Sequence, residues 1–298
     1  MKIMNKTEKQ TIMDYTVQDN FEFTTLKEII IQLLQNTGYL VDLNTTGIAT
    51  GFDKVDAITR GFQSDELCVI ASKPGNGKTA FLLSLLFNIA SKSGKTVGVF
   101  SPERSATKMF YRMIESETRQ SVKKIMTHDL KDSEKEQINA ILYGLSKAEI
   151  FVDDSTILRK DDFNKRCKQL RNKYGADIIF VDGFELFSCG NITDVEPNLD
   201  DRKTMLQDIK DMAHELDIPF VVFSHLTNSY KMQEAENTLA MTSCVDDYIS
   251  QIADTVCLVH RHMTGDKADF IIIKHQNIQQ PEQISLKFIE AIDKFVDL

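Results

Sequence analysis

Short apolar runs recur along the chain from residue 66 to residue 274, separated by longer stretches of mixed polarity. The runs are rich in Val, Ile and Phe and do not alternate with polar residues, which is typical of strands buried on both faces. They predict strands at residues 67–72, 96–101, 149–154, 177–182, 219–224, 255–260 and 269–274. Helical patterns lie between the earlier runs, at residues 78–91, 105–118, 133–147, 160–174 and 200–216. This alternation predicts an α/β fold with a mainly parallel central sheet flanked by helices. The last two runs have no helix between them, so we expect antiparallel strands at the C-terminal end.

The N-terminal segment departs from this pattern. Residues 1–22 are polar, and residues 24–38 predict a short amphipathic helix with its apolar side chains at helical spacing. We therefore expect residues 1–46 to form a polar tail and linker helix, and residues 47–298 to form one α/β domain. The helix has two possible positions, on its own domain or on a neighbouring subunit.

Composition narrows the class of protein. The 298 residues are 42% apolar, enough for one large core, and no apolar run approaches the length of a membrane span. The five cysteines are widely scattered without a C-x-x-C pair, which favours reduced thiols and a cytoplasmic protein. The net charge of −9 argues against a simple nucleic-acid-binding module, because phosphate contact depends on Lys and Arg.

The segment SKPGNGKT at residues 72–79 fits the phosphate-loop pattern G-x-x-x-x-G-K-[ST] except at Ser72. A predicted strand precedes it and a predicted helix follows, so backbone N–H groups and the helix N-terminus would face the phosphates of ATP. Lys78 would reach the β- and γ-phosphates, and the Thr79 hydroxyl would bind Mg²⁺. The expected nucleotide-binding residues are Ser72, Lys73, Pro74, Gly75, Asn76, Gly77, Lys78, Thr79 and Ala80. The alternative is a glycine-rich turn that only caps a helix, with Lys78 facing solvent.

Two carboxylates occur at positions from which they could support Mg²⁺ or activate water beside a phosphate loop. Asp182 follows an apolar run, at the strand edge where α/β sheets bind ligands, and is expected to support Mg²⁺. Its alternative role is to bond nearby backbone in a D-G turn. Glu103 follows the strand after the phosphate-loop helix and is a candidate to activate water. Alternatively, Ser101 caps a helix whose first turn contains Glu103.

Taken together, the motifs resemble the ATPase domain of DnaB-type replicative helicases. The similar segments, in family order, are GIATGFDKVDAITRGFQSDELCVIASKPGNGKTAF, VGVFSPERS, DIIFVDGFELF, IPFVVFSHL, ISQIADTVCLVHR and IIIKHQN. The resemblance covers about residues 24–290 and implies a RecA-like fold that assembles into a ring, usually a hexamer, with ATP between subunits. It assigns Glu103 to the attacking water and His225 to sensing the γ-phosphate.

The same resemblance marks two departures. The family segment Lys-Gln-Arg-Asn-Gly, which reaches the neighbour's ATP, is KHQNI here, so Lys274 is retained and Gln276 replaces the arginine finger. Lys274 is therefore a candidate catalytic residue; the other possibilities are a different arginine, such as Arg261, or slow hydrolysis. The two segments expected to face DNA, residues 188–203 and 230–248, each contain four acidic residues, which weakens the expected contact with single-stranded DNA. The chain also leaves no room for the helical collar domain, so primase docking through such a domain is not expected.

Three functions remain open at this point. The first is a DNA helicase subunit that hydrolyses ATP in a ring and moves on single-stranded DNA. The second is a helicase-like ATP-binding protein with weak hydrolysis that joins or regulates another replication ring. The third is a RecA-like ATPase of the recombinase or clock type.

Overall fold

The computed structural model of the chain describes residues 46–127, 130–156, 159–184, 199–226, 245–262 and 265–298. The predicted helix at residues 24–38 lies outside these ranges. Among the described residues, no helix combines the length and the apolar character that crossing a membrane requires.

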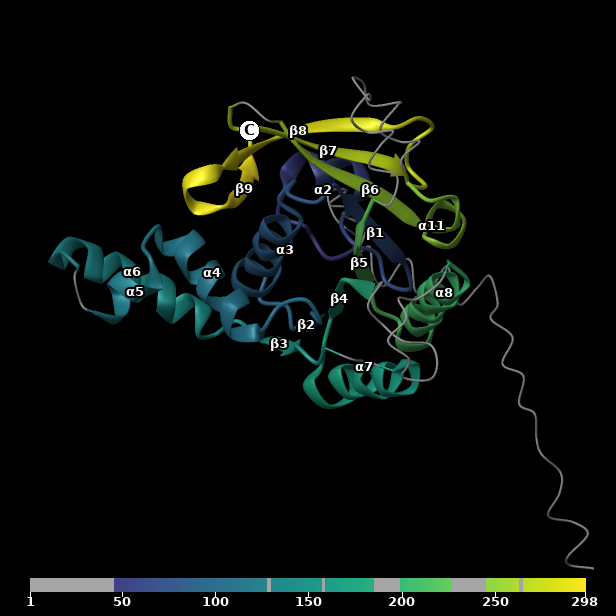
Figure 1. Cartoon of the computed structure of the whole chain (residues 1–298), viewed down its shortest axis with the longest axis horizontal. Coiled ribbons are helices and arrows are strands. Elements are labelled where there is room, and N and C mark those ends of the chain that lie inside the picture. The colour runs from purple at the N-terminus through teal and green to yellow at the C-terminus, as the bar shows by residue number, and fades with distance from the viewer. Residues whose placement is uncertain (1–45, 128–129, 157–158, 185–198, 227–244, 263–264) are drawn as a thin grey trace, which may run out of the picture. The chain divides into compact units, whose positions relative to one another are not determined.

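The described domain is built on one nine-stranded sheet, with strand order β3-β2-β4-β5-β1-β6-β7-β8-β9 (Figure 1). The strands from β3 to β6 in this order are parallel, and β7, β8 and β9 continue the sheet as antiparallel neighbours. Their bounds are β1 Leu67–Ser72, β2 Val97–Phe100, β3 Ile150–Asp153, β4 Ile178–Asp182, β5 Phe220–His225, β6 Thr255–Arg261, β7 Lys267–Lys274, β8 Glu282–Ile289 and β9 Lys294–Asp297. The predicted α/β fold with a mainly parallel sheet and antiparallel C-terminal strands is confirmed.

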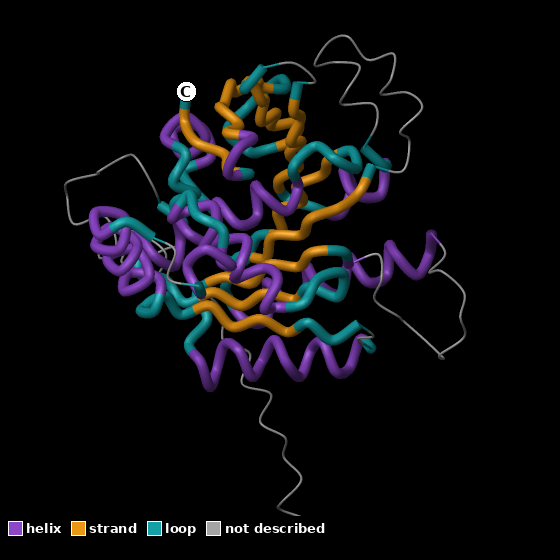
Figure 2. The backbone as a smooth tube through the Cα atoms, turned by 60° about the vertical axis from the view of Figure 1, so that its left-hand side comes forward, coloured by secondary structure: helices purple, strands orange, loops and turns teal. Residues whose placement is uncertain are grey.

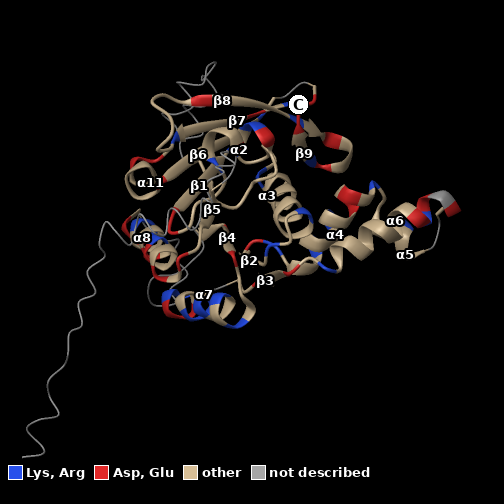
Figure 3. Ribbon diagram, turned by 180° about the vertical axis from the view of Figure 1, so that it is seen from behind, with Lys and Arg blue, Asp and Glu red and all other residues tan. Residues whose placement is uncertain are grey.

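Helices cover both faces of this sheet, as Figure 2 shows. The helices are α2 Asp53–Thr59, α3 Lys78–Leu86, α4 Ala106–Thr118, α5 Val122–Met126, α6 Asp132–Leu145, α7 Lys160–Tyr174, α8 Leu199–Leu216 and α11 Asp247–Ile252, with a π-helical turn η1 Phe87–Lys92 and a 3₁₀ turn η3 Glu290–Ile292. Figure 3 shows Lys and Arg side chains along α7 and both positive and negative residues on α8, whereas most of the central strands carry no charged residue. The five predicted helices are present within a few residues of their expected ends.

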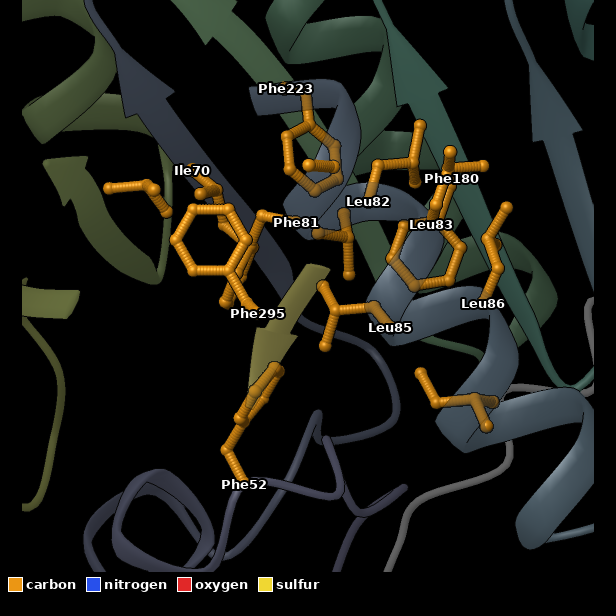
Figure 4. Packing of buried hydrophobic residues seen from close by; sticks show 14 of the residues in the cluster. Phe52, Ile70, Phe81, Leu82, Leu83, Leu85, Leu86, Phe180, Phe223 and Phe295 are labelled. Atoms are coloured by element: carbon orange, nitrogen blue, oxygen red, sulfur yellow. The ribbon is translucent and has the colours of Figure 1, made fainter. Parts of the chain in front are cut away.

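The face of the sheet that carries α3 contains a cluster of phenylalanine rings (Figure 4). Every residue of α3 is buried, because β9 covers the side of the helix that would otherwise face solvent. The Phe81 ring stacks on Phe52 at 5.2 Å between centroids and meets the Phe295 ring edge-on at 5.3 Å. The first turn of α3 is thereby fixed by residues from both ends of the domain.

The opposite face of the sheet is covered mainly by α7, α8 and α11. Phe163 and Cys167 of α7 are fully buried, as are Leu206 and Ile209 of α8. These helices carry their apolar residues at helical spacing and charged residues outside, as expected for helices with one buried face. Because both faces of the central strands are covered, those strands are apolar except near their carboxyl ends, where polar residues occur.

The sequence did not predict α2, α5, α11, β8 or β9. The burial pattern of β8 alternates between exposed and buried positions, since this strand lies beyond the region that helices cover on both faces. An alternating strand has no continuous apolar run, and β9 is only four residues long. Both strands therefore lack the feature from which the others were recognised.

We predict that Phe81→Ala lowers the free energy of unfolding by about 3–5 kcal/mol, because the change leaves a cavity among rings that cannot collapse into it. Met126→Ala at the end of α5 is the matched control, since Met126 is 61% exposed and should change stability by less than about 0.5 kcal/mol. Urea denaturation of each variant measures both values. Equal losses in the two variants would contradict the packing assigned to Phe81.

Candidate active site

The loop between β1 and α3 has the backbone conformation that binds phosphate. Gly75 and Gly77 have φ angles of 82° and 86°, in the left-handed region that residues with a Cβ atom rarely adopt. A Cβ atom on Gly77 would lie 2.9 Å from the Phe295 ring. Gly77 precedes α3 directly and no side chain caps this helix, so the N–H groups of its first turn face the loop. The loop can therefore receive an anion at the helix N-terminus.

Lys78 is buried, with 6% of its surface exposed. Its Nζ lies 3.2 Å from an Asp182 carboxylate oxygen and 3.0 Å from Nε2 of His225. The three residues come from the start of α3 and the ends of β4 and β5, which meet at the carboxyl edge of the parallel strands. The alternative that Lys78 only faces solvent is therefore wrong.

Asp182 is fully buried, and neither carboxylate oxygen accepts a hydrogen bond from any described residue. Its contact with Lys78 leaves most of its acceptor positions open. A buried carboxylate in this state fits a cation or a cation-bound water, because burying it without such partners is unfavourable. The alternative, in which Asp182 bonds the nearby backbone in a D-G turn, is not supported, because no described backbone N–H donates to its carboxylate. Thr79 is buried one residue after Lys78.

Glu103 lies beside these groups, in the segment that joins β2 to α4. Its Oε1 is 3.5 Å from Nε2 of His225, and a Cβ atom on Gly183 would lie 2.9 Å from the same Glu103 oxygen. A hydrogen bond from His225, with the nearby charge of Lys78, holds the pKa of Glu103 below its usual value. Helix α4 begins at Ala106 with Ser105 as its N-cap residue, so Glu103 lies outside the helix and Ser101 does not cap it.

One ring nitrogen of His225 thus faces a cation and a carboxylate. Nε2 can accept a hydrogen bond from Lys78 or, when protonated, donate one to Glu103, but it cannot do both at once. The position of this proton therefore decides which neighbour the ring engages. A residue with this choice, next to a phosphate loop, can respond to the charge that enters the loop.

The sequence did not single out His260, which the structure also places at the loop. His260 precedes Arg261, the last residue of β6, and its Nδ1 lies 3.3 Å from the Asn76 amide nitrogen. Burial lowers the pKa of His260, with the neighbouring His262 as a smaller cause. The neutral ring can accept the Asn76 hydrogen bond and so hold the tip of the loop. Its place at the carboxyl end of a strand next to β1 was the available signal.

Lys274 lies elsewhere in the subunit. Its Nζ contacts the carbonyl oxygens of Ser250 at 2.9 Å and Ala253 at 2.6 Å, just before β6 begins. The phosphate loop is at the other end of these strands, so Lys274 is not brought together with Lys78 within one subunit. Gln276 is on the same side as Lys274 and lies 3.4 Å from a Glu66 carboxylate oxygen.

The two acidic segments expected to face DNA are described only at their ends. Residues 199–203 form the start of α8; Val245 is buried just before α11, and Tyr248 is buried within α11. Residues 185–198 and 227–244 lie outside the described ranges.

Comparison with known proteins agrees with this geometry. The sequence profile of the DnaB-like helicase C terminal domain matches residues 47–297. The chain is 27% identical to the replicative DNA helicase DnaC of Bacillus subtilis (strain 168), over 99% of this chain and 67% of that protein. It is 29% identical to the replicative DNA helicase DnaB of Geobacillus stearothermophilus, over 93% of this chain and 62% of that protein.

The fold also matches a solved structure, that of a DnaB-like replicative helicase described with its interactions with primase. The TM-score is 0.74 at 21% identity, over 93% of this chain and 68% of that one. This likeness supports the RecA-like fold. The chain thus spans only about two thirds of the lengths of these relatives.

We predict that Lys78→Met lowers the free energy of unfolding of the nucleotide-free protein by about 3 kcal/mol, because it leaves Asp182 buried without a counter-charge. The double variant with Asp182→Asn should recover most of this loss, and a double-mutant cycle by urea denaturation measures the coupling. Lys135→Met is the control, since the Lys135–Asp132 pair is exposed and worth less than about 0.5 kcal/mol. Additive losses in the double variant would contradict a coupled buried pair.

Proposed function

The chain belongs to the family of DnaB-like helicase C-terminal domains, and from this premise we propose that it is an ATP-driven DNA helicase subunit. It hydrolyses ATP between subunits of a ring, expected to be a hexamer, and moves on single-stranded DNA. The observation that carries the proposal is the meeting of Lys78, Asp182, His225 and Glu103 beside a glycine loop.

ATP would lie with its phosphates against residues 72–80. The loop N–H groups and the start of α3 supply partial positive charge, and Lys78 supplies a full charge for the β- and γ-phosphates. Thr79 and Asp182 would hold Mg²⁺, which neutralises phosphate charge when it is bound. The open acceptor positions of Asp182 support this assignment.

Glu103 is the group that would orient the attacking water and accept its proton. A glutamate carboxylate is ionised at neutral pH, as accepting a proton requires, and the lowered pKa extends this ionised state to lower pH. His225 would report the γ-phosphate to this base. When the phosphate draws Lys78 toward itself, Nε2 of His225 no longer accepts from Lys78, and with a proton on this nitrogen the ring engages Glu103 alone.

The positions of the two sheet edges support a ring. Lys78 and the turn that carries Lys274 and Gln276 lie at opposite ends of the parallel strands. A head-to-tail repeat brings the second edge of one copy against the first edge of the next, and such heterologous contacts close into rings when the rotation allows. Lys274 would then lie at this interface, as expected from the family pattern, held by the carbonyl oxygens of Ser250 and Ala253.

We predict that Glu103→Gln lowers ATP turnover by about 10²–10⁴-fold with little change in nucleotide affinity, because the amide cannot accept the proton of water. Glu136→Gln, on the exposed face of α6, is the matched control and should leave turnover unchanged. Steady-state phosphate release and binding of a fluorescent ATP analogue separate the two quantities. Wild-type turnover in Glu103→Gln would remove Glu103 from the mechanism.

Single-stranded DNA should accelerate hydrolysis, and its affinity should fall steeply as salt rises, because phosphate contacts release counterions. Phosphate release at a series of salt concentrations, with and without DNA, tests this expectation. Lys78→Ala is the negative control for hydrolysis. DNA-independent turnover together with no DNA binding at low salt would instead favour the regulatory alternative, in which the protein joins another ring.

A further inference from the structure

Helix α2 ends on an arginine in an unusual conformation. Arg60 has φ 61° and ψ 26°, the left-handed region in which a residue with a Cβ atom is unfavourable and glycine is the usual occupant. Its backbone is held on both sides, because its N–H donates to Asp56 at 2.8 Å and its carbonyl accepts from Gly47 at 3.0 Å. The main chain therefore fixes where the side chain starts.

The guanidinium of Arg60 makes no polar or ring contact within the described part of the subunit. The residue is exposed, and no described residue forms a hydrogen bond, an ion pair or a ring contact with its side chain. A second arginine, Arg119, ends α4 in the same conformation with φ 57° and is also exposed. The conformation alone therefore does not mark a site. What distinguishes Arg60 from Arg119 is its position in the fold.

Arg60 lies at the same end of the sheet's strands as Gln276. The Asn277 side chain donates to the carbonyl oxygen of Ile58 at 3.0 Å, which joins the end of α2 to the turn after β7. A pocket at this edge is lined by both of these parts of the chain, including Thr59, Gly61, Gln63, Glu66 and His275. The end of α2 and the 275–277 turn thus form one surface, opposite the phosphate loop.

Three other cations, Lys274, Lys210 and Arg261, already have partners within the subunit. Lys274 is bonded to two carbonyl oxygens that precede β6. Lys210, on the same side, bonds the Asp254 carboxylate and the Ile252 carbonyl oxygen, each at 2.8 Å. Arg261 pairs with Glu290 and lies over the Phe288 ring, at the end of β6 that faces the subunit's own loop. Gln276 carries no charge.

We propose that Arg60 is the arginine finger of this protein and reaches the γ-phosphate of ATP bound at Lys78 of the next copy. The inference rests on the proposed hydrolysis of ATP between copies in a ring. In that step the water oxygen bonds to the γ-phosphorus, the bond from this phosphorus to the ADP oxygen breaks, and the water proton goes to Glu103. The guanidinium stabilises the negative charge on the transferring phosphoryl group.

The first test is Arg60→Gly in the full chain, with Arg119→Gly as the matched control. Turnover of ATP should fall about 10³-fold in Arg60→Gly and stay at the wild-type level in Arg119→Gly. Neither variant should lower the melting temperature, because glycine suits the backbone at both positions. Affinity for a fluorescent ATP analogue should also be unchanged. Wild-type turnover in Arg60→Gly would overturn the inference.

The second test asks whether Arg60 acts in the neighbouring site. Arg60→Gly and Lys78→Ala are each inactive alone, but a mixed ring contains interfaces with an intact loop from the first variant and an intact Arg60 from the second. Mixing should therefore restore turnover above that of either variant, and no recovery would overturn the inference. Gln276→Arg added to Arg60→Gly should also recover activity, because it returns a guanidinium to the same edge.

The outcomes separate this inference from the proposed function. If the wild-type protein does not hydrolyse ATP with or without single-stranded DNA, the proposed function fails. If the wild-type protein does hydrolyse ATP and Arg60→Gly does so equally well, only the assignment of Arg60 fails.

Discussion

The contact between Lys78 and Asp182 is the interaction on which the rest of the site depends. Two opposite charges that water scarcely reaches, 6% and 0% exposed, lie 3.2 Å apart. Such a pair is stable only if its geometry is held, because each charge without the other would be strongly destabilising. The geometry is held by β1 and β4, which lie on either side of β5 and end at the same edge of the sheet. The pairing of these strands therefore positions the two charged groups of the candidate site.

The position of Lys78 at the start of α3 is set by packing on the face of the sheet that carries this helix. Phe295 of β9 packs against Phe81 of α3 and close to Gly77, which precedes the helix. The last strand of the domain thereby fixes the first turn of α3. Glycine is required at position 77 for two reasons: its φ angle is positive, and a Cβ atom there would meet the Phe295 ring.

The sequence predicted the central strands, the five long helices and the phosphate loop with Lys78, because each has a local signature, whereas the roles expected of Glu103 and His225 rested on the family resemblance. Buried parallel strands are continuous apolar runs, and the phosphate loop follows a fixed spacing. The strands β8 and β9 lack such a run, and the contact of His260 with Asn76 joins residues 184 positions apart. A long-range contact of this kind depends on the strand order, which the sequence pattern does not specify. The place of Arg60 beside the 275–277 turn was missed for the same reason.

In the proposed ring, the charges at the loop are the reason that a second copy would complete the site. Lys78 contacts Asp182 and His225, and its charge also acts on Glu103, so one lysine faces two carboxylates. A triphosphate adds further negative charge, which the loop N–H groups and a bound cation can balance in the ground state. In the transition state, charge would shift onto phosphoryl oxygens that the subunit's own lysine reaches from one side. In the proposed ring, a copy placed head to tail would bring its opposite edge to this position, and a cation on that edge would stabilise the shift.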